Sequence, residues 1–146
     1  VGAAAALAIH DPPLIIIDMG TATTMTVIDR EARVLGGAII PGVGISLEAL
    51  ANGTSQLPHI SLDAPKKCIS SDTVEAMRSG SVYGTAAMLD GMIERMEAEL
   101  GEPAAVIATG GLGGCIIPYC RREITYDKNL LLNGLWALYQ KNKRKR

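Results

Sequence analysis

The stretch LIIIDMGTATTMTVID, residues 14–29, constrains the fold of this chain more than any other feature. Its first part is a continuous aliphatic run that ends at Asp18, a pattern typical of a strand buried on both faces of a sheet. Its last part, Thr23–Asp29, is rich in Thr, Val and Ile and alternates in polarity, which predicts a second strand. The short acidic and Thr-rich link between them predicts an antiparallel hairpin.

A third strand is expected at Arg33–Ile40, after a polar turn at Asp29–Ala32. Gly36-Gly37 weakens this strand, because glycine has no side chain to pack against its neighbours. Three successive strands joined by short polar turns predict a three-stranded antiparallel meander.

Helices are expected before and after the meander. The alanine-rich opening residues predict a helix that stops at Asp11-Pro12-Pro13, because proline disfavours helical backbone in the residue before it. The segment is interpreted as the second half of a longer helix, so that the sequence is expected to be a fragment of a longer protein. A short helix follows the Gly/Pro loop that begins at Pro41, and we expect Asn52-Gly53 to cap it.

A long helical region is predicted from Asp72-Thr73-Val74-Glu75, which has the form of a capping box. We expect Gly80, Gly84 and Gly91 to interrupt this region. Between Met88 and Leu100 its apolar residues recur at helical spacing, which indicates either core or a helix–helix interface. The Met-rich helix from Gly84 to Leu100, which contains these residues, is therefore a candidate dimer face.

Short strands are predicted at Ala104–Ala108 and, at a sheet edge, Glu123–Tyr126, and a final helix at Lys128–Asn142. No internal repeat or linker separates these elements. Residues 1–146 are accordingly interpreted as a single α/β domain, with a mixed sheet that contains the meander and with flanking helices.

Composition argues against several classes of function. The net charge is −1 and aromatic residues make up 3% of the chain, so we expect no nucleic-acid partner. No apolar stretch approaches the roughly 18 residues that a membrane span needs, and no signal peptide is visible. Three cysteines without a matching Cys or His pair indicate reduced thiols in a cytoplasmic protein rather than a metal site.

Two readings of the hairpin link remain open. Asp18 and the threonines can simply cap the turn. Alternatively, they can hold phosphate and a cation, because backbone N–H groups and hydroxyls suit phosphate oxygens and a carboxylate suits a hard cation. Gly20 would then let the backbone approach the anion closely. The spacing matches neither a P-loop nor a dinucleotide fingerprint.

A second glycine-rich turn, Thr109-Gly110-Gly111, follows the predicted strand at 104–108. A Gly-Gly turn allows a flat ring or a ribose to lie against the backbone. Taken with the hairpin and with the GGAIIPG segment, it makes a nucleotide cleft more plausible than any one turn does.

The order of meander, helix, strand, TGG turn, strand and helix resembles half of the ribonuclease H-like, actin-like ATPase fold that sugar kinases and Hsp70 share. Four motifs, IDMGTATTMTVID, GGAIIPGVGISLEAL, SSDTVEAMRSGSVYG and VIATGGL, resemble the C-terminal half of a type III pantothenate kinase. The resemblance implies ATP-dependent phosphorylation of pantothenate, the first step of coenzyme A synthesis. It also implies a homodimer, Mg²⁺ and a monovalent cation, K⁺ or NH₄⁺.

The resemblance also assigns roles to individual residues. It makes Asp18 the monovalent-cation ligand, and it makes Thr73 a pantothenate contact that is reached across the dimer interface. It implies ATP binding at Gly20, Thr21, Gly110 and Gly111, with Thr21 at the phosphates and the two later glycines near the adenosine. For Thr73 the alternative is an ordinary first-turn helix residue.

In the family, an N-terminal half carries an Asp-x-Gly-Asn-Thr phosphate loop and a Gly-Ala-Asp-Arg segment whose Asp is the general base. The alignment implies that both lie upstream of Val1, so no catalytic residue is expected in this chain, and the polypeptide alone is expected to be inactive. A separate N-terminal half is a possible partner. Two alternatives stay open: another kinase of the same fold, or a non-catalytic regulatory module derived from the family.

Overall fold

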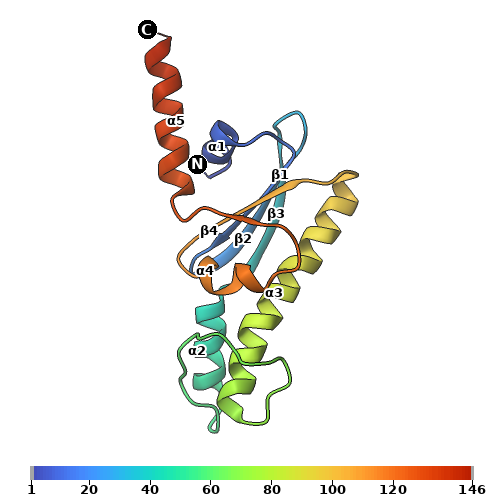
Figure 1. Cartoon of the computed structure of the whole chain (residues 1–146), viewed down its shortest axis with the longest axis vertical. Coiled ribbons are helices and arrows are strands. Elements are labelled where there is room, and N and C mark those ends of the chain that lie inside the picture. The colour runs from blue at the N-terminus through green and yellow to red at the C-terminus, as the bar shows by residue number, and fades with distance from the viewer. Residues whose placement is uncertain (1, 146) are drawn as a thin grey trace.

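A five-stranded mixed sheet, in the order β3-β2-β1-β4-β5, organises the chain in the computed structural model, which describes residues 2–145 (Figure 1). The strands are β1 (Leu14–Met19), β2 (Ala22–Ile28), β3 (Val34–Pro41), β4 (Ala105–Thr109) and β5 (Thr125–Tyr126). The first three form an antiparallel meander, whereas β4 runs parallel to β1 and β5 parallel to β4. The predicted mixed sheet with its meander is confirmed.

The central strand β1 is buried on both faces, as its unbroken aliphatic run predicts. Ile15 and Ile17 belong to the core on one side of the sheet, and Leu14 and Ile16 to the core on the other. This alternation follows from the two-residue period of a strand, which sends neighbouring side chains to opposite faces. Helices must therefore cover both faces.

One face is covered by α3 (Thr73–Leu100), a continuous helix of 28 residues. The expected interruptions at Gly80, Gly84 and Gly91 are wrong. Each glycine costs about 1 kcal/mol relative to alanine in a helix, and packing of an apolar face on a sheet outweighs a local propensity of that size. The Asp72 side chain accepts a hydrogen bond from the Glu75 N–H, as the capping-box pattern predicts.

The apolar stripe of α3 belongs to the core of the chain. Leu89 and Ile93 are fully buried, and Met88, Met92 and Met96 pack against the same cluster beneath the sheet. The stripe that was a candidate dimer face is therefore occupied by the chain's own sheet.

The other face of the sheet is covered by α1 (Gly2–Ile9) and α5 (Leu130–Arg144), which pack against each other. Gly134 of α5 faces the backbone of Ala5, where a Cβ atom would overlap it. The second core cluster is smaller than the first, and only Ala6 of α1 and Leu130 of α5 contribute buried side chains to it. In Figure 1, α5 runs alongside α1 and continues away from the sheet.

The remaining elements connect these layers. Helix α2 (Val43–Gly53) follows β3; the expected Asn52-Gly53 cap is replaced by Thr54, whose hydroxyl donates to the Leu50 carbonyl at 2.9 Å. Residues 54–72 contain no helix or strand. After β4 come a short helix α4 (Gly113–Ile116) and a 3₁₀ turn (Ile117–Tyr119).

Among residues 2–145, none of the helices combines the length and the apolar character that a membrane span requires.

Candidate nucleotide and substrate sites

The β1–β2 hairpin closes through the two residues predicted to contact phosphate, Gly20 and Thr21. The Gly20 N–H donates to the Ala22 carbonyl at 3.2 Å, and the Thr21 carbonyl accepts from the Gly42 N–H at 3.1 Å. Gly20, Thr21 and Asp18 are all exposed. Within the described part of the chain, the side chains of Asp18 and Thr21 make no hydrogen bond, so neither of them caps the hairpin turn.

Helix α2 starts against the tip of this hairpin. A Cβ atom on Gly42 would overlap the Thr21 carbonyl, so only glycine allows this approach. Gly42 precedes the first residue of α2, and the first N–H groups of a helix carry partial positive charge. The hairpin tip therefore has a helix N-terminus beside it.

The TGG turn reaches the same end of the sheet through strand pairing. Parallel strands β1 and β4 align Asp18 with Thr109, so Gly110 and Gly111 follow directly. Gly110 has φ +103°, and a Cβ atom on it would overlap the backbone of Met19. The glycine at 110 is thus required for packing against β1, whereas nothing lies within 4 Å of the corresponding point at Gly111, which is exposed. Of the two glycines, only Gly111 has open space at the position of a side chain.

Oxygen-bearing side chains lie in one row across three strands. Asp18 pairs with Thr24 of β2 on one side and with Thr109 of β4 on the other, so the three side chains share a face of the sheet. Among residues 2–145 no group of three His, Cys, Asp or Glu residues is arranged to hold a metal ion. A carboxylate flanked by hydroxyls supplies oxygen ligands, which hard cations prefer.

Two neighbouring cavities meet at Asp18. One, of about 240 Å³, is lined by Asp18 and the TGG turn together with Lys128, Asn129, Leu131 and Leu132. The other, of about 450 Å³, extends over the face of the sheet and is lined by Gly2, Ala3, Ile16, Asp18, Thr24, Thr26, Thr109, Leu130 and Leu131. Asp18, Gly110 and Gly111 are thus brought together, with Gly20 and Thr21 at the tip of the same hairpin but outside both cavities.

Sequence reasoning missed Tyr126 and Lys128. The Tyr126 hydroxyl donates a hydrogen bond to the Gly110 carbonyl at 2.7 Å and so helps to fix the TGG turn in place. Lys128 adds a positive charge to the cavity that contains Asp18. The signal that could have found both residues is the parallel strand pairing, because residues that follow parallel strands gather at one edge of a sheet.

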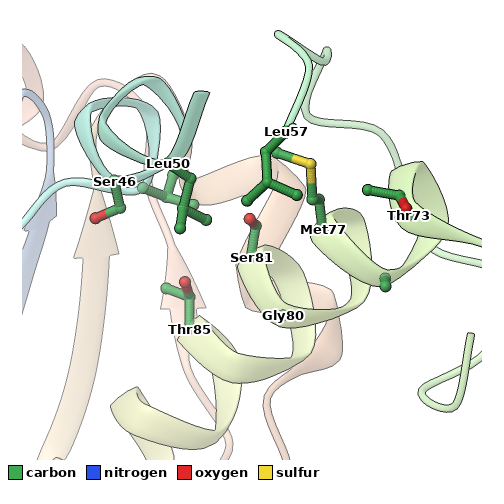
Figure 2. Close-up of a pocket in the computed structure, with 10 residues that line it drawn as sticks. Ser46, Leu50, Leu57, Thr73, Met77, Gly80, Ser81 and Thr85 are labelled. Atoms are coloured by element: carbon green, nitrogen blue, oxygen red, sulfur yellow. The ribbon is translucent and has the colours of Figure 1, made fainter. Parts of the chain in front are cut away.

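Thr73 lies at the start of α3, in a separate groove of about 580 Å³ between α2 and α3 (Figure 2). The groove shares no lining residue with the two cavities at Asp18. Figure 2 shows Ser46 and Leu50 of α2 facing Ser81 and Thr85 of α3, with Thr73 beyond Met77. Val43, which opens α2 next to Gly42, also lines the groove and connects it to the hairpin.

Comparisons of the sequence with a family model and with known proteins point to the same family. The family model for type III pantothenate kinase matches residues 1–95. A type III pantothenate kinase from an Exiguobacterium species is 45% identical over 99% of this chain and 56% of its own length. Another from Exiguobacterium sibiricum is 46% identical over 98% of this chain and 56% of its own length. The chain therefore spans a little over half of the length of these relatives.

Solved structures show the fold. A Campylobacter jejuni protein assigned to the Baf family of transcriptional activators matches with a TM-score of 0.67 and 24% identity, over 97% of this chain and 63% of that chain. A non-polymerisable quadruple mutant of pCBH ParM matches with a TM-score of 0.56 and 12% identity, over 98% of this chain and 52% of that chain. The chain has the actin-like ATPase fold that ParM and similar neighbours share.

Proposed function

This chain belongs to the type III pantothenate kinase family, and from this we propose that it forms part of an enzyme that transfers a phosphoryl group from ATP to pantothenate. That reaction is the first step of coenzyme A synthesis, and we expect it to take place in the cytoplasm. The observation that carries the proposal is the pairing of β1 with β4, which brings Asp18 and the open backbone of Gly111 to one cavity.

ATP is proposed to bind along this edge of the sheet. Its phosphates would lie at the hairpin tip, where the N-terminus of α2 and the exposed Thr21 hydroxyl supply donors. Lys128 would add positive charge, and the adenosine would rest against Gly111. Phosphoryl transfer depends mainly on positioning and on stabilisation of charge, and these groups are proposed to contribute to both.

The row formed by Asp18, Thr24 and Thr109 is the proposed site of K⁺ or NH₄⁺. Its donors are one carboxylate and two hydroxyls, and Asp18 is free to turn toward a cation because it is exposed. Mg²⁺, which retains waters and binds readily to substrate phosphates, is expected to enter with ATP rather than in a protein cage.

Pantothenate is proposed to bind in the groove between α2 and α3. The hydroxyls of Ser46, Thr73, Ser81 and Thr85 line it together with apolar side chains. This mixture suits a small molecule that has hydroxyl, amide and carboxylate groups on a branched aliphatic body. Because Thr73 lies apart from the Asp18 cavities, the proposal includes a homodimer in which one protomer's groove serves its partner's ATP site.

Thr73→Ala tests the substrate assignment. In an active enzyme we expect the KM for pantothenate to rise about tenfold, as roughly 1–2 kcal/mol for one lost hydrogen bond predicts. The KM for ATP should stay the same. Equal changes in both constants would contradict a pantothenate contact at this position.

The activity itself is tested with an assay that couples ADP release to a colour change, in the presence of ATP, Mg²⁺, K⁺ and pantothenate. A polypeptide of these 146 residues alone is proposed to show no turnover, because the resemblance implies that the family's base and first phosphate loop belong to the N-terminal region of the relatives. Joining the N-terminal region of the Exiguobacterium sibiricum relative ahead of Val1 is expected to give pantothenate-dependent turnover. Turnover of a different acceptor alcohol, and none of pantothenate, would overturn the proposed substrate.

A further inference from the structure

Two consecutive residues, Tyr126 and Asp127, hold the two rims of the cavity at Asp18. One rim is the TGG turn, and the other is the segment that leads into α5, beginning with Lys128. Tyr126 ends the two-residue strand β5, and the Asp127 N–H extends the pairing with β4 by donating to the Ala108 carbonyl at 2.9 Å. Successive side chains along a strand point to opposite faces of the sheet. The first residue can therefore contact the TGG turn while the next contacts α5.

The Tyr126 side chain fixes the TGG turn by hydrogen bonding and by packing. Its hydroxyl donates to the Gly110 carbonyl at 2.7 Å, and the Gly113 N–H donates to the same oxygen at 3.2 Å. Both lone pairs of that carbonyl are therefore used. The tyrosine ring lies so close to Gly113 that a Cβ atom there would overlap it.

The Gly110 carbonyl belongs to the peptide group that links Gly110 to Gly111. A peptide group is planar and trans, so its N–H points away from its carbonyl. By holding the Gly110 carbonyl, the Tyr126 hydroxyl therefore also sets the direction of the Gly111 N–H, which points away from the tyrosine.

The Gly111 N–H has no hydrogen-bond partner among residues 2–145, although Gly111 lines the cavity. Gly111 is exposed, and no atom lies within 4 Å of the point where its Cβ would be. A backbone N–H placed in this way is a typical polar contact of a small-molecule site. Because its direction is already fixed, less ordering is needed when a ligand acceptor binds to it.

The Asp127 side chain fixes the opposite rim. Its carboxylate accepts from the Asn129 N–H at 2.9 Å and from the Asn133 side-chain amide at 3.1 Å. Its backbone carbonyl accepts from the Leu130 N–H at 3.2 Å. Lys128 lies between these anchored residues and lines the cavity. Hydrogen bonds to a carboxylate are stronger than those to a neutral acceptor, so Asp127 restricts where the Lys128 backbone can lie.

We propose that Tyr126 is a positioning residue for the nucleotide: its hydroxyl, acting through the Gly110 carbonyl, aims the Gly111 N–H at the nucleoside part of ATP. Asp127 has the matching task on the rim that carries Lys128. The identity of the ligand as a nucleotide rests on the proposed function. Because Tyr126 acts through the turn and not on the reacting phosphate, its effect is on nucleotide binding and not on the chemical step.

Tyr126→Phe keeps the ring against Gly113 and removes only the hydroxyl. The variant is made in the protein that carries the N-terminal region of the Exiguobacterium sibiricum relative ahead of Val1. Dissociation constants for ATP and for ADP are measured by isothermal titration calorimetry. We expect both to rise about fivefold, as one lost hydrogen bond predicts, and by the same factor, because the two ligands share the nucleoside. The KM for ATP should rise similarly, while kcat and the KM for pantothenate stay the same.

Tyr119→Phe is the matched control. Tyr119 is also half-buried, its ring packs edge-on against Tyr83 with centroids 5.5 Å apart, and its hydroxyl makes no hydrogen bond among residues 2–145. This variant should leave both dissociation constants unchanged. Asp127→Ala removes the side-chain bonds to α5 and should weaken nucleotide binding severalfold, whereas Asp127→Asn retains an acceptor oxygen and should weaken it less. Circular dichroism and the urea midpoint check that each variant folds.

Unchanged nucleotide binding in Tyr126→Phe, or an equal loss in Tyr119→Phe, would overturn the positioning role. A rise for ATP alone, or an equal rise in the KM for pantothenate, would also overturn it, because the effect would then not lie at the nucleoside. Nucleotide binding that depends on Tyr126, without turnover of pantothenate, would refute the proposed function and keep the positioning role. Pantothenate turnover with ATP binding unaffected by Tyr126→Phe would do the reverse.

Discussion

At the scale of single residues, the two glycines of the TGG turn have different roles although the motif treats them alike. Gly110 has a positive φ and packs against the Met19 backbone, whereas Gly111 has open space around it. Gly110→Ala is therefore expected to destabilise the chain by about 1–3 kcal/mol. Gly111→Ala should change the free energy of unfolding by less than about 0.5 kcal/mol. Urea unfolding of both variants measures the difference, and equal effects would contradict the assignment.

Asp18 can be tested in the same way in the protein joined to the relative's N-terminal region. Asp18→Asn keeps the size of the side chain and removes the charge that faces the hydroxyls of Thr24 and Thr109. Activation by K⁺ is expected to fall on the order of tenfold, which corresponds to roughly 1.4 kcal/mol. Rates with and without K⁺ measure this, and Asp11→Asn, at an exposed position before β1, is the control. An unchanged K⁺ response would exclude the cation role.

The sequence singled out Asp18 and the TGG turn but did not show that they lie close together. Asp18 and the TGG turn each stand out locally, because an apolar run stops at a polar or glycine-rich turn. Their proximity depends on the parallel pairing of β1 with β4, which no local pattern encodes. Lys128 was missed for the same reason, since it reaches the cavity through the pairing of β4 with a two-residue strand.

At the scale of elements, glycines in helices show where local propensity and packing disagree. Gly84 of α3 is exposed and a Cβ atom would touch nothing, whereas Gly134 of α5 faces the backbone of Ala5. Gly84→Ala is expected to stabilise the chain by about 0.5–1 kcal/mol. Gly134→Ala should destabilise it by about 1–3 kcal/mol, because α1 and α5 must move apart. Urea midpoints of the pair test this, and a stabilising Gly134→Ala would mean that the contact between the two helices is loose.

The boundaries of the elements also show which features depend on local sequence and which depend on tertiary packing. The strands of the meander were predicted to within a residue or two, because alternation and turn residues are local signals. The unbroken length of α3 was not predicted, since it depends on the sheet on which Val82, Leu89 and Ile93 pack. Burial of the apolar face of α3 against the sheet keeps the helix continuous where the low helix propensity of glycine alone predicted an interruption.

At the scale of the whole molecule, the two faces of the sheet are covered unequally. Helix α3 covers one face with a broad cluster, while α1 and α5 bury only a few side chains on the other and leave apolar side chains such as Leu132 and Trp136 exposed. The candidate nucleotide cavity opens on this thinly covered side. The sheet is therefore packed most extensively on the α3 side, and ligands are proposed to bind on the side that is packed least.

The pH dependence of unfolding tests how α3 is fixed to the rest of the molecule. Burial raises the pKa of Glu97, but hydrogen bonds from Arg122 at 2.7 Å and from the Ala104 N–H at 3.1 Å outweigh it and lower the pKa below its usual value. A carboxylate with a lowered pKa in the folded state stabilises the fold above its unfolded pKa of about 4.5. That stability is lost as the pH falls through the folded value.

Glu97→Gln should therefore reduce stability at pH 7 and flatten the decline in stability between about pH 5 and pH 3. Glu94→Gln is the matched control, because Glu94 is exposed on the same helix and has no hydrogen bond or ion pair among residues 2–145. Urea unfolding at a series of pH values measures both variants. The contact joins the end of α3 to the segment before β5, so its loss should loosen the β4–β5 edge that supports the TGG turn. If Glu97→Gln and Glu94→Gln gave the same pH profile, Glu97 would be a surface carboxylate with no part in fixing α3.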